Sequence, residues 1–538
     1  PNAALIAATI VEKVRINPGN YADRKKFDFI EYSDTSYEQE LDRIRERFIP
    51  LVKICKENGV AIRIGTNHGS LSDRILSRYG DTPLGMVESA MEFIRICEEF
   101  DYHDLILSMK ASNTQVMVQA YRLAVAIMRR EGMNYPLHLG VTEAGEGEDG
   151  RIKSAVGIGS LLEDGVGDTI RVSLTEDPEL EIPVAQQLVQ RYSTRNSHSE
   201  IRSIENPPFR PYDYTRRSTI SAGNIGGNNV PRVIIDLSAI NKLIPEDLID
   251  AGYIYSESLD KWTISEQAAD FVYIGKGQLS FELPGTLNMI QDEDAWQKKD
   301  QTLPLFSLDH YLKYSGSGGA INFVCISLSD CFKPELYTLK NKQEIVLVID
   351  TANEHGIAEQ RRAFFEIINI NWDVPIVIRR DYNAITKDEF QLFTATDLGS
   401  LLIDGFGDGI WLIADKPINL ITQTCFGILQ ATRTRISKTE YISCPSCGRT
   451  LFDLQDITEK IRSKTNHLKG VKIGVMGCIV NGPGEMADAD YGYVGTGIGQ
   501  ISLYKGYDVV KRNIPSKKAV DALIDLIKEN GDWVELDG

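Results

Sequence analysis

Short runs rich in β-branched and apolar residues alternate with longer amphipathic stretches from residue 1 to about residue 176. The short runs predict strands at residues 14–17, 61–65, 105–109, 137–141 and 169–174. The longer stretches have apolar residues at helical spacing and predict helices, among them residues 3–14, 37–57 and 115–131. Regular βα alternation is typical of a parallel sheet with helical crossovers.

This alternation predicts an α/β fold of the TIM-type (β/α)8 barrel class. Five strands can be counted and a closed barrel needs eight, so we expect three further βα units before Pro1. The chain starts without an initiator Met and in the middle of a helical pattern, which favours the same interpretation. The N-terminal part of the barrel is therefore expected to be absent from this chain.

A ten-residue segment occurs twice. Residues 159–168 read GSLLEDGVGD and residues 399–408 read GSLLIDGFGD, so eight of ten positions are identical at an offset of 240. Further strands are predicted around the second copy at residues 232–237, 271–274, 321–328, 344–350, 376–378 and 410–414. The repeat predicts a second barrel-like region. The second copy replaces Arg171 and Ser173 by Trp411 and Ile413, which favours a structural role for it.

From about residue 430 the pattern changes again, because Gly and Cys concentrate and the helical pattern returns only at residues 517–529. We therefore expect four segments. They are an incomplete substrate-binding barrel (1–180), a linker (181–205), an inserted barrel-like structural domain (206–425) and a C-terminal α+β domain (426–538).

The chain has 538 residues with 58 basic and 76 acidic side chains, a net charge of −18. This balance argues against a nucleic-acid surface, which needs a basic patch to displace counterions. No apolar run approaches the roughly 20 residues that span a bilayer.

Three of the eight cysteines form a pattern typical of a metal centre. Cys444 and Cys447 form a CxxC motif, Cys478 follows, and Glu485 lies in the turn-rich segment NGPGE. Structural zinc prefers four Cys or His ligands, whereas a [4Fe–4S] cluster held by three thiolates leaves one iron for a weaker ligand. We expect such a cluster in the C-terminal domain, with a zinc knuckle as the alternative.

Basic and polar residues cluster at the ends of the predicted strands. Arg15, Arg63, Lys110 and Arg171 occupy such positions, and Glu143 follows the fourth strand. Barrel enzymes carry their sites at these strand ends. Four cations there, in an acidic chain, indicate a polyanionic substrate, most simply a diphosphate that Arg can bind bidentately. The alternative is that each cation pairs with an acidic side chain of the protein.

These residues resemble motifs of (E)-4-hydroxy-3-methylbut-2-enyl diphosphate synthase. Segments 15–20, 63–71, 108–112, 139–145 and 165–174 resemble its barrel, and segments 443–455 and 477–490 resemble its cluster domain. The intervening residues resemble the inserted domain of the larger, three-domain form found in plants and some bacteria. The resemblance implies an iron–sulfur oxidoreductase of the methylerythritol phosphate (MEP) pathway of isoprenoid biosynthesis. It would reduce and open 2-C-methyl-D-erythritol 2,4-cyclodiphosphate.

The resemblance also implies residue roles. Cys444, Cys447 and Cys478 would hold a [4Fe–4S] cluster, with Glu485 on the fourth iron at rest. Glu143 would be the acid that helps the hydroxyl leave. The substrate would be held by a larger set: Arg15, Arg63, Asn67, Ser70, Lys110, Thr142, Arg171, Ser173 and Asn481.

Two rival functions remain at this stage. One is a non-catalytic iron–sulfur electron-transfer protein on a barrel scaffold, which would be expected to offer four Cys ligands rather than three. The other is a pterin- or phosphate-binding barrel transferase with a structural zinc tail. For the synthase, a ferredoxin or flavodoxin electron donor and a homodimer are expected, with no nucleic acid or membrane as partner. Its compartment would be the cytoplasm of a bacterium or the plastid stroma of a plant.

Overall fold

The computed structural model describes residues 2–23, 31–193, 201, 203–315, 318–342, 344–445, 449–480, 482–486 and 488–535, the side chain of Glu485 excepted. The chain divides into two compact units. One contains residues 1–186, 211–213 and 438–538, and the other contains residues 187–210 and 214–437.

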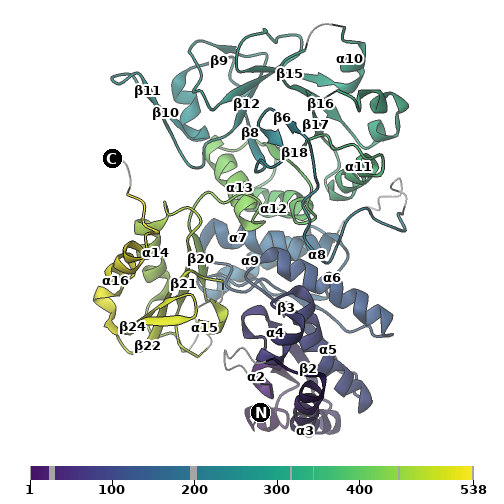
Figure 1. Ribbon diagram of the computed structural model, residues 1–538, viewed down its shortest axis with the longest axis vertical. Coiled ribbons are helices and arrows are strands. Elements are labelled where there is room, and N and C mark those ends of the chain that lie inside the picture. The colour runs from purple at the N-terminus through teal and green to yellow at the C-terminus, as the bar shows by residue number, and fades with distance from the viewer. Residues whose placement is uncertain are drawn as a thin grey trace. The chain divides into compact units, whose positions relative to one another are not determined.

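The N-terminal part of the first unit contains a row of parallel strands, as the alternating pattern predicts (Figure 1). Strands β1, β2 and β3 pair in that order, a parallel bridge joins Leu107 of β3 to Leu137, and β4 pairs with β5. The bounds are β1 Lys13–Ile16, β2 Ala61–Asn67, β3 Leu105–Lys110, β4 His138–Leu139 and β5 Thr169–Ile170. All five predicted strands are therefore present.

Helices connect these strands, and their ends follow local capping rules. The side chains of Ser33, Ser72 and Thr82 each accept a backbone N–H from the first turn of a helix, and Pro83 occupies a first helical position. The helices are α1 Asn2–Ala7, α2 Pro18–Tyr21, α3 Asp34–Asn58, α4 Asp73–Tyr79, α5 Pro83–Glu99, α6 Thr114–Arg130, α7 Gly147–Ser154, α8 Ser160–Glu163 and α9 Glu181–Gln190.

The predicted first helix is too long. Helix α1 ends at Ala7 and β1 begins at Lys13, whereas residues 3–14 were expected to be helical. Thr9, Ile10 and Val11 follow the helix, and β-branched side chains lose rotamer freedom in a helical backbone.

The second unit contains a closed barrel of eight parallel strands, which confirms the predicted second barrel. The order is β12-β14-β15-β16-β17-β18-β19-β8, and β19 closes the ring by pairing with β8. The bounds are β8 Arg232–Asp236, β12 Phe271–Gly275, β14 Asn288–Asp292, β15 Thr302–Ser307, β16 Asn322–Ile326, β17 Ile345–Ile349, β18 Ile376–Asp381 and β19 Gly409–Ile413.

Strands β14 and β15 were not predicted, because no helix separates them from β12 or from each other. Helices α10 Leu308–Lys313, α11 Ile357–Asn369, α12 Lys387–Ile403 and α13 Ile418–Ala431 accompany the later strands. The short pairs of this unit are β6 Ser221–Ala222 with β7 Ile225–Gly226, β9 Lys242–Leu243 with β13 Gln278–Leu279, and β10 Tyr253–Ser256 with β11 Lys261–Ile264.

The repeated segment has the same local structure in both units. In each copy an aspartate follows the last helical turn and accepts a hydrogen bond from an arginine of a neighbouring helix. Arg122 Nε donates to Asp164 and Arg361 Nε donates to Asp404, both at 2.7 Å. The shared bond explains why the motif is kept in a copy that has lost its polar strand end.

The last aspartate of each copy holds the backbone at the start of a neighbouring strand. Asp168 accepts the backbone N–H of Leu137 at 2.8 Å, and Asp408 accepts that of Ile376 at 3.0 Å. The motif therefore sets strand register in both sheets. This supports the interpretation that its second copy is structural.

The C-terminal part of the first unit is a five-stranded mixed sheet in the order β20-β21-β22-β23-β24. The first three strands are parallel and the last two pairings are antiparallel. The bounds are β20 Glu440–Ser443, β21 Lys472–Met476, β22 Tyr491–Gly497, β23 Gln500–Lys505, β24 Asp508–Pro515, α14 Leu454–Thr465, α15 Gly482–Glu485 and α16 Ser516–Glu529.

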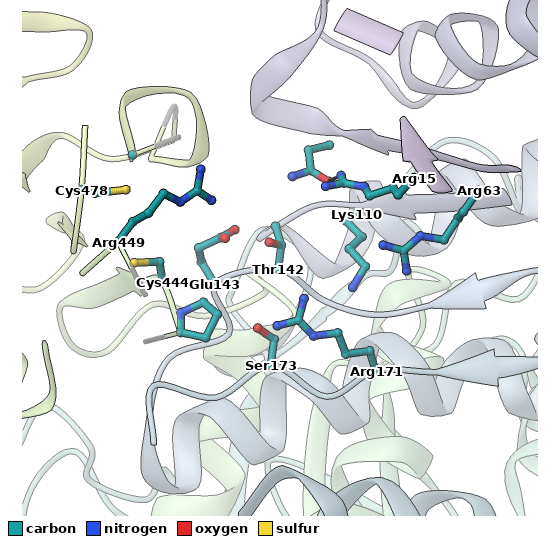
Figure 2. A pocket seen from close by; sticks show the side chains of 13 residues that line it. Arg15, Arg63, Lys110, Thr142, Glu143, Arg171, Ser173, Cys444, Arg449 and Cys478 are labelled. Carbon is teal, nitrogen blue, oxygen red and sulfur yellow. Dashed lines mark hydrogen bonds between the residues drawn. The ribbon is translucent and has the colours of Figure 1, made fainter. Parts of the chain in front are cut away.

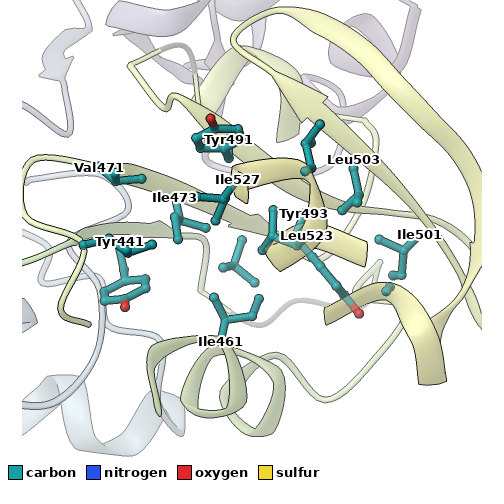
Figure 3. Packing of buried hydrophobic residues seen from close by; sticks show 14 of the residues in the cluster. Tyr441, Ile461, Val471, Ile473, Tyr491, Tyr493, Ile501, Leu503, Leu523 and Ile527 are labelled. Carbon is teal, nitrogen blue, oxygen red and sulfur yellow. The ribbon is translucent and has the colours of Figure 1, made fainter. Parts of the chain in front are cut away.

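Helices α14 and α16 pack on this sheet. Ile461 of α14 and Leu523 and Ile527 of α16 form one buried cluster with Ile473 and Tyr493 of the strands (Figure 3). Helix α16 matches the predicted 517–529, but α14 was missed. Because β20 and β21 are parallel neighbours, Cys444 and Cys478, which follow them, lie at the same edge of the sheet.

Candidate active site

One cavity in the first unit collects polar side chains from its two sheets (Figure 2). Its volume is about 220 Å3. The N-terminal sheet contributes residues at or after the C-terminal ends of its strands, and the C-terminal sheet contributes the segments that follow β20 and β21. The lining residues are Arg15, Arg63, Asn67, Lys110, Thr142, Glu143, Arg171, Ser173, Cys444, Pro445, Arg449, Cys478 and Gly482.

Arg15 and Arg63 stand side by side on β1 and β2, where they are register partners. Arg15 Nη2 donates to the carbonyl of Gly65 at 3.1 Å and to Oδ1 of Asn67 at 3.3 Å. Burial lowers the pKa of Arg63, and the positive charges of Arg15 and Arg171 lower it further. Such a group of like charges favours a bound anion.

His138 supports this group from β4. Its Nε2 lies 3.4 Å from Nη1 of Arg63. Burial, Lys110 and Arg63 lower the pKa of His138 to about 4, so the ring is neutral near pH 7. A neutral ring can accept a hydrogen bond from the guanidinium group at Nε2, so His138 orients Arg63 without adding positive charge.

Lys110 ends β3 and is only 7 % exposed. A Cβ at Gly140 would lie 2.8 Å from Nζ of Lys110 and 2.7 Å from the carbonyl oxygen of Arg171. The glycine therefore leaves the space that the lysine occupies. Burial lowers the pKa of Lys110 to about 7, with further contributions from Arg171 and Arg63.

Glu143 is held in the loop after β4 in a left-handed backbone conformation, with φ of 47°, and is 2 % exposed. The N–H of Thr142 donates to the carbonyl of Ala111 at 3.2 Å, and the carbonyl of Gly145 accepts the N–H of Thr175 at 2.9 Å. Non-glycine residues with positive φ persist where the surroundings fix them, often at functional sites. The loop is therefore built to place one carboxyl group in the cavity.

The cysteine side of the cavity is formed by two adjacent strand ends. Cys444 Sγ accepts the backbone N–H of Gly477 at 3.3 Å, and the side chains of Cys444 and Cys478 are both partly exposed. Arg449 also extends into the cavity from this side (Figure 2).

Buried polar contacts join the two parts of the first unit. Lys153 of α7 forms an ion pair with Glu440 of β20 at 2.8 Å. The hydroxyl of Thr175 lies 2.6 Å from that of Ser443, the residue before Cys444. These contacts fix β20, and with it the first cysteine, against the barrel strands.

Most of the predicted substrate-binding residues line this cavity, and one does not. Ser70 accepts a hydrogen bond from Asn17 Nδ2 at 2.8 Å and donates to the carbonyl of Asn67 at 3.0 Å, so its hydroxyl braces the loop after β2. Cys447, Asn481 and the side chain of Glu485 lie outside the described residues.

Arg449 was not predicted as a site residue. The available signal was its position two residues after Cys447, which places it near any metal that the CxxC motif holds.

The residues present fit an iron–sulfur cluster. Thiolates ligate such clusters, and backbone N–H groups that donate to sulfur tune them. Cys444 offers a thiol with such a donor, and Cys478 offers a second thiol at the same cavity. Among the described residues, which omit Cys447 and the Glu485 side chain, no group of three His, Cys, Asp or Glu could hold a metal ion.

Comparison with known proteins identifies both parts of the first unit. Residues 1–186 match the GcpE TIM-barrel domain, and residues 440–529 match the GcpE protein C-terminal domain. A protein of Parabacteroides distasonis is 50 % identical across 99 % of this chain and 84 % of its own length. It is named 4-hydroxy-3-methylbut-2-en-1-yl diphosphate synthase (flavodoxin).

More distant relatives have the same name apart from the electron donor. The Leptospira interrogans protein is 45 % identical over 99 % of this chain and 84 % of its own length, and is also named as the flavodoxin type. The Arabidopsis thaliana protein is 43 % identical over 99 % of this chain and 76 % of its own length, and is named as the ferredoxin, chloroplastic type. The chain therefore belongs to the 4-hydroxy-3-methylbut-2-en-1-yl diphosphate synthase family of iron–sulfur oxidoreductases.

Proposed function

We propose that this chain converts 2-C-methyl-D-erythritol 2,4-cyclodiphosphate into (E)-4-hydroxy-3-methylbut-2-enyl diphosphate in the MEP pathway of isoprenoid biosynthesis. The reaction takes up two electrons and one proton, opens the ring so that the freed phosphate oxygen stays ionised, and releases water. One observation carries the proposal. Five basic side chains, one buried carboxyl group and two cysteines of the CxxC–Cys pattern line a single cavity.

Cys444, Cys447 and Cys478 would hold a [4Fe–4S] cluster, with Glu485 as an exchangeable oxygen ligand. When bound, such a cluster supplies electrons one at a time and an iron whose fourth position is open. The partly exposed thiols of Cys444 and Cys478 on one cavity wall support this assignment.

The barrel side chains bind the diphosphate. Arg15, Arg63 and Arg171 offer guanidinium forks that match phosphate oxygens, and Asn67 and Ser173 add neutral hydrogen-bonding groups beside them. Their role is to hold the substrate ring in one orientation toward the cysteine side. Positioning of this kind lowers the barrier by fixing the reacting atoms before the chemical step.

Glu143 is the proton donor for the departing hydroxyl, and Thr142 and Asn481 are proposed to bind the substrate. The surrounding cations favour its ionised form in the empty cavity, and a bound diphosphate offsets their charge and favours the protonated form. Burial at 2 % exposure keeps bulk water away from the carboxyl group. The proton is therefore available at the carboxyl oxygen when the substrate is in place.

A metal analysis tests the cluster and its main rival. The chain is purified anaerobically, its iron, acid-labile sulfide and zinc are measured, and its visible spectrum is recorded. We expect iron and sulfide in nearly equal amounts and a broad absorbance band near roughly 400 nm, the region of iron–sulfur chromophores. One zinc per chain without that band would instead favour the zinc-tail transferase.

The electron donor is a flavodoxin or a ferredoxin, since relatives of both types are similar over nearly the whole chain. A homodimer and a location in the bacterial cytoplasm, or in the stroma for a plant source, complete the proposal. No helix among the described residues is long and apolar enough to span a bilayer.

A further inference from the structure

Lys110 is the one cavity cation that is both buried and without an acidic partner in the described part of the chain. It is 7 % exposed, and its Nζ has no hydrogen bond or ion pair to any described residue. The guanidinium groups of Arg15, Arg63 and Arg171 converge on the same side of the cavity (Figure 2). A buried ammonium group without a counter-ion is costly, and three neighbouring cations increase that cost.

The charged groups around Lys110 come from every neighbouring strand. Arg15 lies on β1, Arg63 on β2 and Arg171 directly after β5, and all three disfavour a charge on the lysine. Glu143, in the loop after β4, favours the charge, and His138 of β4 is neutral near pH 7. Burial is the largest cause of the lowered pKa of Lys110, and with the repulsion from these cations it brings the pKa to about 7.

We propose that a large fraction of Lys110 is uncharged in the substrate-free enzyme at and above neutral pH and that this fraction takes up a proton when the cyclic diphosphate binds. The inference rests on the proposed function, because it needs an anionic substrate in this cavity. A bound diphosphate places negative charge among the four basic groups and makes the ammonium form favourable again. The proton comes from solvent, and no bond to the substrate is formed or broken in this step.

The acquired charge matters for the chemical step. Each phosphorus of the cyclic substrate carries one ionised oxygen. When the ring carbon–oxygen bond breaks, the oxygen remains on phosphorus and becomes a further anionic oxygen, while the donor protein supplies the two electrons that carbon requires. A Lys110 ammonium beside the diphosphate offsets this additional charge as it develops. Lys110 is therefore a catalytic residue whose charge increases when substrate binds at or above neutral pH.

Proton uptake is measured by titration calorimetry. The substrate, 2-C-methyl-D-erythritol 2,4-cyclodiphosphate, is titrated into the oxidised holoenzyme without reductant, so that it binds without turnover. Each titration is repeated in two buffers of unlike ionisation enthalpy, which yields the protons bound per substrate. With a pKa near 7, Lys110 should take up about 0.9 proton at pH 8 and about 0.1 at pH 6. The substrate phosphates do not titrate in this range.

Variants separate Lys110 from Glu143, which also gains a proton in the proposed mechanism. Lys110→Arg, with a permanent charge, should lose the difference in uptake between pH 8 and pH 6. Glu143→Gln removes any proton uptake by Glu143 and should keep the Lys110-dependent difference between pH 8 and pH 6. Lys13→Arg, an exposed change at the start of β1, is the matched control and should behave as the parent chain.

A second readout does not depend on variants. In the parent chain, substrate Kd should be constant below about pH 6.5 and rise about tenfold per pH unit above pH 7.5, the behaviour of one linked proton. The inference is overturned if the parent chain takes up the same number of protons per substrate at pH 6 and pH 8. It is also overturned if Lys110→Arg keeps the difference in proton uptake between these pH values. Absence of any binding in the parent chain overturns the proposed function itself.

Discussion

The buried ion pair between Lys153 and Glu440 predicts how strongly the two parts of the first unit depend on each other. The two charges are 2.8 Å apart, with side chains 10 % and 8 % exposed. At an effective dielectric constant of about 20, unit charges at that distance attract by about 6 kcal/mol. Desolvation offsets much of this attraction, so the intact pair adds little net stability.

Removing one partner is different, because the other charge remains buried. Lys153→Met should lower the free energy of unfolding by about 3–5 kcal/mol, the usual cost of breaking a buried pair. The double variant Lys153→Met/Glu440→Leu should lose less than the single variant, since it leaves no unpaired charge. The matched control is Lys464→Met. Lys464 pairs with Asp521 at 2.8 Å, but the side chains are 49 % and 71 % exposed, and we expect a loss of at most about 1 kcal/mol.

The assay is anaerobic equilibrium unfolding in urea of the cluster-loaded chain, followed by cluster absorbance and by far-ultraviolet circular dichroism. Cluster absorbance reports the first unit, because the cysteines and the pair belong to it, whereas circular dichroism reports the secondary structure of both units. If Lys153→Met is as stable as Lys464→Met, or if the double variant is less stable than the single one, the pair does not hold β20 against the barrel.

The remaining predictions concern the cluster, the two carboxyl groups and the inserted barrel. Replacing any one of the three proposed cysteine ligands by serine should abolish the visible chromophore and turnover together, and a variant with a full cluster contradicts the ligand assignment. Glu143→Gln should leave the resting EPR and Mössbauer spectra unchanged and slow single turnover by about 10²–10⁴-fold. Glu485→Gln should instead change the resting spectra before substrate is added. The reverse pattern would show that the two roles are exchanged. Arg379→Met removes the 2.5 Å ion pair with Asp350. It should lower the thermal unfolding midpoint of the second unit and leave the substrate KM unchanged. A raised KM at unchanged stability would refute the structural role of the inserted barrel.

Much of the fold follows from periodicity, because each strand of the first sheet is a short apolar run between amphipathic helices. Where that contrast is missing, prediction failed. Strands β14 and β15 lack intervening helices, so two strands of the second barrel had no local signal that distinguishes them from loops. The end of α1 was misplaced because Ile10 and Val11 continue the apolar pattern while their β-branched side chains favour extended backbone.

Helix α14 was missed for a different reason. Its apolar positions Leu454, Ile457 and Ile461 have helical spacing, but they lie between the glycine-rich cysteine segments that dominated the interpretation of the domain. Its burial against the sheet becomes evident only when β21 and β22 are in place. Local composition therefore obscured a helix that tertiary packing stabilises.

The barrel half of the candidate site was accessible from sequence, because parallel strands bring their carboxyl ends to one edge and thus gather Arg15, Arg63 and Lys110. The contribution of Arg449 was only partly accessible, because its position two residues after Cys447 places it near the cysteines but no local pattern shows how the C-terminal sheet docks on the barrel. Ser70 is a predicted substrate ligand whose role stays a prediction. It follows the strand end as a ligand would, but its hydroxyl is used by Asn17 and Asn67.

The central claim is that the cavity shared by the barrel strand ends and the cysteine segments reduces a cyclic diphosphate. It is tested most directly by mixing the anaerobically prepared, iron–sulfur-loaded chain with 2-C-methyl-D-erythritol 2,4-cyclodiphosphate and a reduced flavodoxin, with phosphorus NMR and mass spectrometry as readouts. The account predicts loss of the cyclic substrate and appearance of linear 4-hydroxy-3-methylbut-2-enyl diphosphate, with two electrons consumed per product. It predicts no product from Cys478→Ser. A fully loaded cluster that accepts electrons from flavodoxin, while the cyclic diphosphate stays intact, would contradict the account and favour the electron-transfer protein.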